Sequence, residues 1–171
     1  LSLDFKGRPF SGGDVFMARL GAGISDHSLA LVHHFVMAGN LVINSADALE
    51  NSRDKLRTAQ LLARAGLPAP RTAFAPDPDY LIRAFKAVGG PPVVMKLPRS
   101  TQGRGVMFAD SCKEAQSIAD TMWALERDVI VQEFIDSAKG SDLRIIVVGG
   151  MAIGAVRRRA SKEEFRSNLH R

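Results

Sequence analysis

The stretch Val93-Val-Met-Lys-Leu-Pro-Arg-Ser-Thr-Gln-Gly-Arg-Gly-Val-Met-Phe108 places an apolar run, a lysine and a glycine loop in direct succession. The apolar run predicts a buried strand that ends at Lys96, and the loop that follows leads into a second strand. A lysine in this position supplies a point charge, and glycine lets backbone N–H groups approach phosphate oxygens closely. The pattern therefore suits a polyphosphate, although Gly103-Arg-Gly105 alone is a weak signal.

Downstream residues predict a helix, a strand and a hairpin. Ser111-Cys-Lys-Glu114 is typical of a capping box, in which serine and glutamate satisfy each other's free backbone N–H groups. The helix that it opens is followed by a strand over Val129–Ile135. Leu143–Val148 and Met151–Val156 predict a hairpin, because the Gly149-Gly150 pair between them can adopt the positive φ angles of a tight turn.

Upstream residues extend the same pattern towards the N-terminus. Ser52 can cap a helix that runs to Ala65, and this helix would carry Lys55 in its first turn. After a proline-containing linker, Arg71–Phe74 predicts a strand and Pro78–Val88 a helix. The order of strands and helices indicates an α+β sandwich with a mixed sheet.

The first 50 residues predict a separate αβ piece. A strand over Asp14–Ala18, a helix over Asp26–Ala38 with Asp26 as its N-cap, and a strand over Leu41–Ile43 are expected. The piece is too small for a complete doubly wound domain and resembles the end of one. The start at Leu1 rather than methionine predicts processing or a fragment.

Composition places the chain among globular proteins. Of its 171 residues, 46% are hydrophobic and 24% are charged, and no run approaches the roughly 18 apolar residues of a membrane span. The one cysteine, Cys112, is compatible with a reducing compartment, so we expect a cytoplasmic protein.

The charge balance permits nucleic-acid binding but does not favour it. The chain has 23 basic and 18 acidic residues, a net charge of +5 and a pI near 9.8. The basic residues cluster at Arg157-Arg-Arg159 and near the C-terminus, and there is one Trp and one Tyr. Aromatic residues interleaved with basic ones, which stack nucleic-acid bases, are therefore absent from the sequence.

The ordered set of motifs resembles the ATP-grasp superfamily and, more narrowly, the RimK-like α-L-glutamate ligases. Neither the dinucleotide fingerprint GxGxxG nor the phosphate loop GxxxxGK[ST] is present. The stretches that carry the resemblance are Arg53-Asp-Lys-Leu-Arg57, Gln60-Leu-Leu-Ala-Arg64, Thr101-Gln-Gly-Arg-Gly-Val106, Val131-Gln-Glu133, Arg158-Arg-Ala160 and Phe165-Arg-Ser-Asn-Leu-His-Arg171. The family fold implied is α+β, with two subdomains that grip ATP between them. The resemblance assigns residues 51–171 to this ATP-grasp domain, incomplete at its C-terminal end, and residues 1–50 to the C-terminal part of a pre-ATP-grasp domain.

The resemblance also implies roles for residues around the nucleotide. Lys55 and Lys96 would contact the phosphates. Glu133 and Phe134 would lie at the hinge, where main-chain groups read the adenine edge. Asp142 would accept a hydrogen bond from a ribose hydroxyl.

The phosphate and substrate side is implied at the C-terminal end. Arg166, Ser167 and Asn168 would lie on the phosphate and metal side. Arg158, together with its neighbour Arg159, suits charge neutralisation on an acyl phosphate or an acidic substrate, and Arg158 is the catalytic candidate.

Two features depart from the family pattern. The magnesium-binding carboxylates are expected beyond Arg171, so no complete metal site is expected in this chain and the chain alone is expected to be inactive. Arg157 stands where the family pattern has an acidic residue beside the arginine pair.

The implied activity is ATP-dependent carboxylate–amine ligation with Mg²⁺ or Mn²⁺. ATP would phosphorylate a glutamate-type carboxylate, and an amine would displace phosphate from the acyl phosphate to form an amide. The implied acceptor is a protein C-terminus, with a small-subunit ribosomal protein as one option and a small-molecule carboxylate as another. No membrane partner is expected, and the sequence is compatible with a homo-oligomer.

Two other classes of function remain open at this point. A non-catalytic ATP-grasp-like module would keep the fold and lose the metal end. A nucleic-acid-binding domain would explain the high pI and would show steeply salt-dependent binding that is indifferent to ATP.

Overall fold

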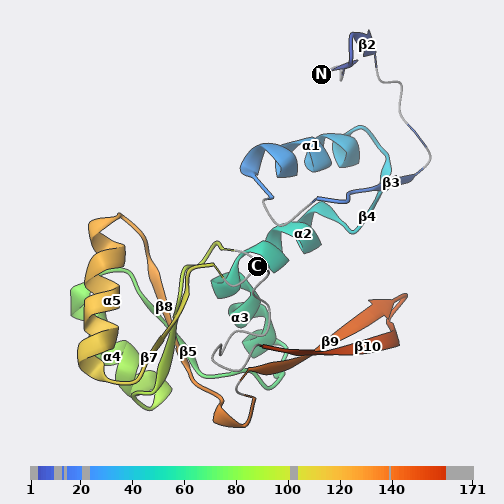
Figure 1. Ribbon diagram of the computed structural model, residues 1–171. Helices are drawn as coiled ribbons and strands as arrows, with labels where there is room; N and C mark the ends of the chain where they lie inside the picture. Colours follow the sequence, from blue (N-terminus) through green and yellow to red (C-terminus); the bar gives the residue numbers. More distant parts are fainter. Residues whose placement is uncertain are drawn as a thin grey trace. The chain divides into compact units, whose positions relative to one another are not determined.

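A computed structural model describes residues 4–9, 13, 15–20, 24–100, 104–138 and 140–160. The chain divides into two compact units, Leu1–Asp54 and Lys55–Arg171 (Figure 1). The division falls shortly after the expected one between residues 50 and 51. That the first unit is the end of a pre-ATP-grasp domain stays a prediction.

The first unit is a small αβ layer. Its elements are β1 (Asp4–Phe5), β2 (Arg8–Pro9), β3 (Val15–Met17), α1 (Asp26–Met37), β4 (Leu41–Ile43) and α2 (Ala46–Arg53). β3 and β4 pair in parallel, and α1 makes the crossover between them, as parallel strands require. Val32, Val42 and Ala46 form the core, and the rings of Phe16 and Phe35 stack beside it with centroids 4.1 Å apart.

The expected N-cap of α1 at Asp26 is wrong by one residue. Ser25 has extended backbone angles, and its Oγ accepts a hydrogen bond from the Ser28 N–H at 3.1 Å. Asp26 occupies the first turn instead, where a carboxylate interacts favourably with the helix dipole. The same carboxylate forms an ion pair with Arg53 at 2.8 Å.

The single helix expected from Ser52 to Ala65 is also wrong. Asp54 has extended backbone angles and separates α2 from α3 (Lys55–Arg64). Ser45 caps α2, whereas Ser52 lies inside it and donates to the Leu49 carbonyl. The break is stabilised from another part of the chain, because the Lys55 N–H at the start of α3 donates to the Pro98 carbonyl at 3.0 Å.

The second unit is built on a four-stranded sheet in the order β5–β8–β6–β7. The strands are β5 (Thr72–Ala75), β6 (Val93–Lys96), β7 (Val106–Ala109) and β8 (Val129–Glu133), and the helices between them are α4 (Pro78–Val88) and α5 (Cys112–Ala124). Every neighbouring pair in this sheet is antiparallel, so the expected mixed sheet is wrong. α4 connects β5 to β6 and α5 connects β7 to β8, and the two strands of each pair run parallel to each other. An antiparallel strand separates each pair: β8 lies between β5 and β6, and β6 lies between β7 and β8.

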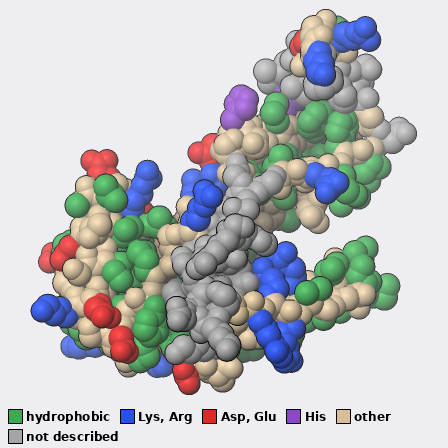
Figure 2. Space-filling model, in the orientation of Figure 1, with side chains coloured by type: hydrophobic (Ala, Val, Ile, Leu, Met, Phe, Trp, Pro, Cys, Tyr) green, Lys and Arg blue, Asp and Glu red, His purple; other side chains and the backbone are tan. Residues whose placement is uncertain are grey.

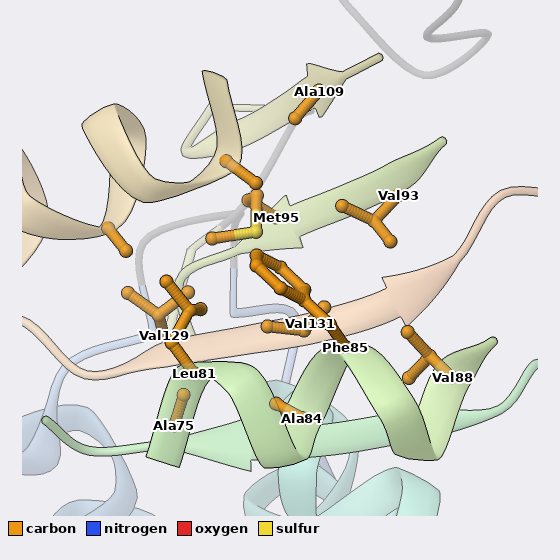
Figure 3. Close-up of a cluster of buried hydrophobic side chains, with 12 residues drawn as sticks. Ala75, Leu81, Ala84, Phe85, Val88, Val93, Met95, Ala109, Val129 and Val131 are labelled. Carbon is orange, nitrogen blue, oxygen red and sulfur yellow. The ribbon is translucent and has the colours of Figure 1, made fainter. Parts of the chain in front are cut away.

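α4 and α5 cover one face of this sheet, and the core lies between them (Figures 1 and 3). α4 points Leu81, Phe85 and Val88 inwards, at the spacing of one helical face. Met95 and Val131 meet them from β6 and β8, where alternate residues point to opposite faces. The residues that alternate with these, among them the buried Val94 and Ile130, point to the opposite face of the sheet.

The expected capping box at α5 is confirmed in one of its two bonds. Ser111 Oγ accepts from the Glu114 N–H at 3.2 Å. The Glu114 carboxylate accepts from the N–H of Asp110 at 2.8 Å, one residue before the cap.

The expected hairpin is confirmed and is longer than predicted. It consists of β9 (Ser141–Val148) and β10 (Met151–Arg159), follows the 3₁₀ turn η1 (Asp136–Ala138), and contains a register shift between Ala152 and Gly154. Apolar side chains are exposed along both strands, and Figure 2 shows them towards the tip with Lys and Arg side chains nearer the base. No helix among the described residues is long and apolar enough to cross a membrane.

The packing of α4 gives a stability prediction. Leu81 is fully buried, whereas its neighbour Ile82 is 57% exposed. Leu81→Ala should lower the free energy of unfolding by about 2–5 kcal/mol, since it removes apolar contacts and leaves a cavity. Ile82→Ala should change it by only about 0.5 kcal/mol. Urea denaturation of the longest natural chain measures both, and equal losses would contradict this orientation of α4.

Candidate functional site

Three polar side chains share the sheet face that α4 and α5 leave uncovered. Lys96 ends β6, Gln132 lies on β8 and Thr72 begins β5. Their neighbours Met95 and Val131 point into the core, so the alternation of a strand places Lys96 and Gln132 on the opposite face. Lys96, predicted from the sequence, therefore lies on the face of the sheet opposite α4 and α5, next to the glycine loop.

Lys96 is a cation in a poorly solvated position. Burial, with a smaller contribution from the charge of Lys55, lowers the pKa of Lys96 from 10.5 to about 8. Its Nζ donates a hydrogen bond to Gln132 Oε1. Because this partner is a neutral amide, the contact leaves the positive charge uncompensated. Among the described residues no carboxylate pairs with Lys96, and a desolvated cation without such a partner favours an anionic ligand.

Lys55 reaches the same loop from the first turn of α3. Its Nζ lies 3.2 Å from the Leu97 carbonyl oxygen, 2.7 Å from the Ser100 carbonyl oxygen and 2.9 Å from Ser100 Oγ. These bonds tie α3 to the residues that follow Lys96. A phosphate contact by Lys55 stays a prediction, and it would require a phosphate oxygen to join or replace these acceptors, since an ammonium has three hydrogens.

The loop after β6 is closed by a tight contact at its base. The Leu97 N–H donates to the Gly105 carbonyl at 3.0 Å. Gly105 has φ of +64°, and a Cβ there would lie 2.8 Å from Leu97 Cδ1. Glycine is therefore required both by the backbone angle and by the close approach. Residues 101–103 of the loop lie outside the described part of the chain.

Glu133, predicted at the hinge, is held by Arg71. Its carboxylate accepts from the Arg71 N–H at 2.8 Å and from Arg71 Nε at 2.5 Å, and these bonds, with the backbone N–H contributing most, lower the pKa of Glu133. The Glu133 N–H donates to the Arg71 carbonyl at 2.9 Å. Because that N–H already donates to Arg71, a main-chain contact with adenine would involve the Glu133 carbonyl or the main chain of Phe134.

Phe134 adds an aromatic surface beside this hinge. Its ring lies edge-on to that of Phe108 on β7, with centroids 4.9 Å apart and an interplanar angle of 71°. Edge-to-face pairs of this kind are favourable beyond the area they bury. The pair offers an apolar surface next to the residues predicted to contact adenine.

Asp142 and Arg158, predicted to contact different parts of the ligands, bind each other across the hairpin. They are register partners of β9 and β10, and Arg158 donates from Nε to Oδ1 at 2.7 Å and from Nη2 to Oδ2 at 2.6 Å. The hydrogen bonds to Asp142 raise the pKa of Arg158 above its ordinary value. A bidentate pair of this kind fixes the plane of the guanidinium, so it can orient Arg158 for a ligand.

Arg166, Ser167 and Asn168 lie outside the described residues, and their predicted contacts stay predictions. Within the described part of the chain, no three His, Cys, Asp or Glu side chains come together to hold a metal ion.

Sequence reasoning gave no role to Gln132, Thr72 or Arg71. The signal for Gln132 was its place in the strand alternation, on the same face as Lys96, whereas the partners of Thr72 and Arg71 come from strand pairing.

Comparisons with known sequences match the chain to one family. A family model described as the RimK-like ATP-grasp domain matches residues 52–171. A probable α-L-glutamate ligase 1 of Pseudoalteromonas atlantica is 45% identical over 170 residues, covering 99% of this chain and 56% of the relative. A probable α-L-glutamate ligase of Vibrio vulnificus strain YJ016 is 44% identical over 167 residues, with 98% and 56% covered. The chain thus spans little more than half the length of these relatives.

Solved structures share the fold. A RimK domain ATP-grasp protein from Sphaerobacter thermophilus superposes with a TM-score of 0.73 at 25% identity, covering 92% of this chain and 60% of that one. D-alanyl-alanine synthetase A from Vibrio cholerae gives a TM-score of 0.71 at 13% identity, with 95% and 50% covered, which shows the fold alone. The predicted α+β ATP-grasp fold is confirmed.

The contact at the base of the loop gives a second prediction. Gly105→Ala and Gly66→Ala both place alanine at a φ near +65°, but at Gly66 no atom lies within 4 Å of the new Cβ. The positive φ should cost each variant about 1–2 kcal/mol of unfolding free energy. Gly105→Ala should lose about 1–3 kcal/mol more, because Leu97 must move. Equal losses in a denaturation experiment would contradict the close approach of Leu97.

Proposed function

The chain belongs to the RimK-like ATP-grasp family, and from this membership we propose that its parent protein is an ATP-dependent carboxylate–amine ligase that adds glutamate. The curated relatives support this proposal, since those described above are named probable α-L-glutamate ligases. In the finer form of the proposal, the acceptor is a protein C-terminus, such as that of a small-subunit ribosomal protein, or a small-molecule carboxylate, and the reaction takes place in the cytoplasm.

The observation that carries the proposal is the environment of Lys96. The residue is a desolvated cation at the end of a strand, it is bonded to a neutral amide, and the glycine loop begins beside it. The γ-phosphate of ATP would supply the missing negative charge. Lys55, which is tied to the same loop, would lie near the phosphates as a second cation.

The proposed reaction has two steps. A carboxylate oxygen of the acceptor forms a bond to the γ-phosphorus as the bond to the bridging oxygen of ADP breaks. The amine of glutamate then attacks the acyl-phosphate carbonyl, a C–N bond forms, the amine loses a proton and inorganic phosphate leaves. Lys96 would offset the charge of the transferring group, and Arg158, held in plane by Asp142, would offset charge on the acyl phosphate.

The remaining predicted residues would complete the nucleotide site. Phe134 and the Glu133 carbonyl would contact adenine, and Asp142 would accept from a ribose hydroxyl while it holds Arg158. Arg166, Ser167 and Asn168 would bind phosphate. Mg²⁺ or Mn²⁺ would enter with ATP, and no cluster of the described His, Cys, Asp or Glu side chains could hold it.

Calorimetric titration of ATP with magnesium into the longest natural chain, with and without glutamate, tests the proposal. We expect saturable binding and a heat that changes when glutamate is present. Lys96→Met should weaken ATP binding about 10- to 100-fold, the loss of a hydrogen bond to a charged group. Lys86→Met, on the exposed surface of α4, is the matched control and should bind like the natural protein. Absence of ATP binding by the natural protein would reject the function, and unchanged binding by Lys96→Met would reject the role of Lys96.

The lowered pKa of Lys96 predicts a pH dependence. A folded-state pKa of about 8, below the ordinary 10.5, means that burial penalises the charged form. This penalty on folding is complete below about pH 8 and disappears as the pH rises towards 10.5.

ATP would stabilise the charged form of Lys96, so ATP binding should take up a proton at pH values above 8, and the affinity for ATP should fall as the pH rises through 8. Titrations at about pH 8.5 in two buffers of different ionisation enthalpy measure the uptake. Lys96→Met should abolish it, and equal heats in both buffers for the natural protein would contradict the assignment.

A further inference from the structure

We propose that Thr72 and Gln132 are positioning residues for Lys96, linked to it in a hydrogen-bond relay that starts at the Pro70 carbonyl. The relay is a property of the protein without nucleotide. The inference rests on the proposed function only for what the lysine is aimed at, namely the phosphates of ATP.

The relay crosses three neighbouring strands of the sheet. Thr72 Oγ1 donates to the Pro70 carbonyl at 2.8 Å, Gln132 Nε2 donates to Thr72 Oγ1 at 2.7 Å, and Lys96 Nζ donates to Gln132 Oε1. Thr72 and Gln132 are register partners of β5 and β8. Lys96 is the register partner of Ile130, so its long side chain reaches Gln132 along the diagonal.

The two ends of the relay fix its direction. A carbonyl oxygen can only accept, so the one hydroxyl hydrogen of Thr72 goes to Pro70. The hydroxyl oxygen must then accept from Gln132, and this requires the NH₂ group of the amide to face Thr72. The amide oxygen consequently faces Lys96, whose ammonium can only donate. Both Thr72 and Gln132 are therefore needed to present an acceptor to the lysine.

The beginning of the relay is itself held in place. Arg71, between Pro70 and Thr72, is bonded to Glu133 through its N–H, its carbonyl and its side chain. Arg71 and Glu133 thus join the ends of β5 and β8 one residue away from the relay pair. The predicted adenine hinge and the position of Lys96 are in this way connected through two adjacent pairs of residues.

An amide suits this position better than a carboxylate. Glutamine gives the ammonium a directional partner and keeps its full positive charge available to a phosphate. A carboxylate would hold Lys96 equally well but would neutralise it. The flexible four-carbon side chain of lysine has many rotamers, and the hydrogen bond to the Gln132 amide restricts them before the nucleotide binds.

The first test is the pKa of Lys96 in the nucleotide-free natural protein, measured by NMR of the side-chain nitrogen. Gln132→Met removes the acceptor for the charged form and should lower this pKa below 8. Thr72→Val leaves the Gln132 amide free to turn and should lower it in the same direction. Thr72→Ser keeps the hydroxyl and should restore the natural value, whereas Gln132→Glu should raise the pKa.

The second test is ATP affinity in the same variants. We expect about tenfold weaker binding for Gln132→Met and for Gln132→Glu, about threefold weaker binding for Thr72→Val, and near-natural binding for Thr72→Ser. The opposite pKa shifts of Gln132→Met and Gln132→Glu, combined with weaker binding in both, would not follow from a purely structural role.

Two residues of α5 supply matched controls. Gln116 donates to Asp120 and Thr121 donates to the Ser117 carbonyl, so Gln116→Met and Thr121→Val remove the same kinds of hydrogen bond far along the chain from the relay. Both should leave the pKa of Lys96 and the ATP affinity unchanged.

The outcomes separate this inference from the proposed function. A pKa of Lys96 that stays at its natural value in Gln132→Met and Thr72→Val overturns the relay, whether or not the protein binds ATP. If the variants shift the pKa of Lys96 as expected but the natural protein does not bind ATP, the relay is supported and the proposed function is rejected. If Gln132→Met fails to fold, the pair Thr72→Val and Thr72→Ser decides by the same measurements.

Discussion

The antiparallel register of β6 and β8 is the constraint on which the candidate site depends. It sets Val94 opposite Gln132 and Lys96 opposite Ile130, so the lysine reaches the amide diagonally. A shift of one residue would turn Lys96 into the core beneath α4 and α5 and would bring Met95 to the outer face. The same apolar alternation that stabilises the core therefore also fixes which side chains can meet a nucleotide.

Function at this site opposes stability. Burial of Lys96 near a second lysine disfavours its charged form, and the amide that holds it does not neutralise it. Other interactions of the fold offset this unfavourable burial. They are the apolar core under α4 and α5, the Arg71–Glu133 pair, and the hydrogen bonds from Lys55 to the loop. A site that is unfavourable until an anion binds agrees with the proposed nucleotide binding, since the binding of the anion would relieve the penalty.

The hairpin contributes in a different manner. Its side chains are exposed on both faces, and its one described bidentate ion pair joins Asp142 to Arg158 near the base. Here the orientation of Arg158 comes from a cross-strand pair, not from a packed core. The chain covers little more than half of its curated relatives, so the activity of a whole protein stays a proposal.

The sequence by itself determined the elements and the family. Hydrophobic alternation, turn glycines and the order of the motifs located most strands and helices and indicated the ATP-grasp fold, because these signals are local. Lys96 was identified from the same stretch. The tertiary structure decided what depends on partners distant in the chain. Helix α3 starts at Lys55 because Pro98 accepts its N–H, and β8 inserts between β5 and β6, which makes the sheet antiparallel. The partners of Gln132 and Glu133 are likewise set by strand pairing, since residues about 60 positions apart in the sequence meet there.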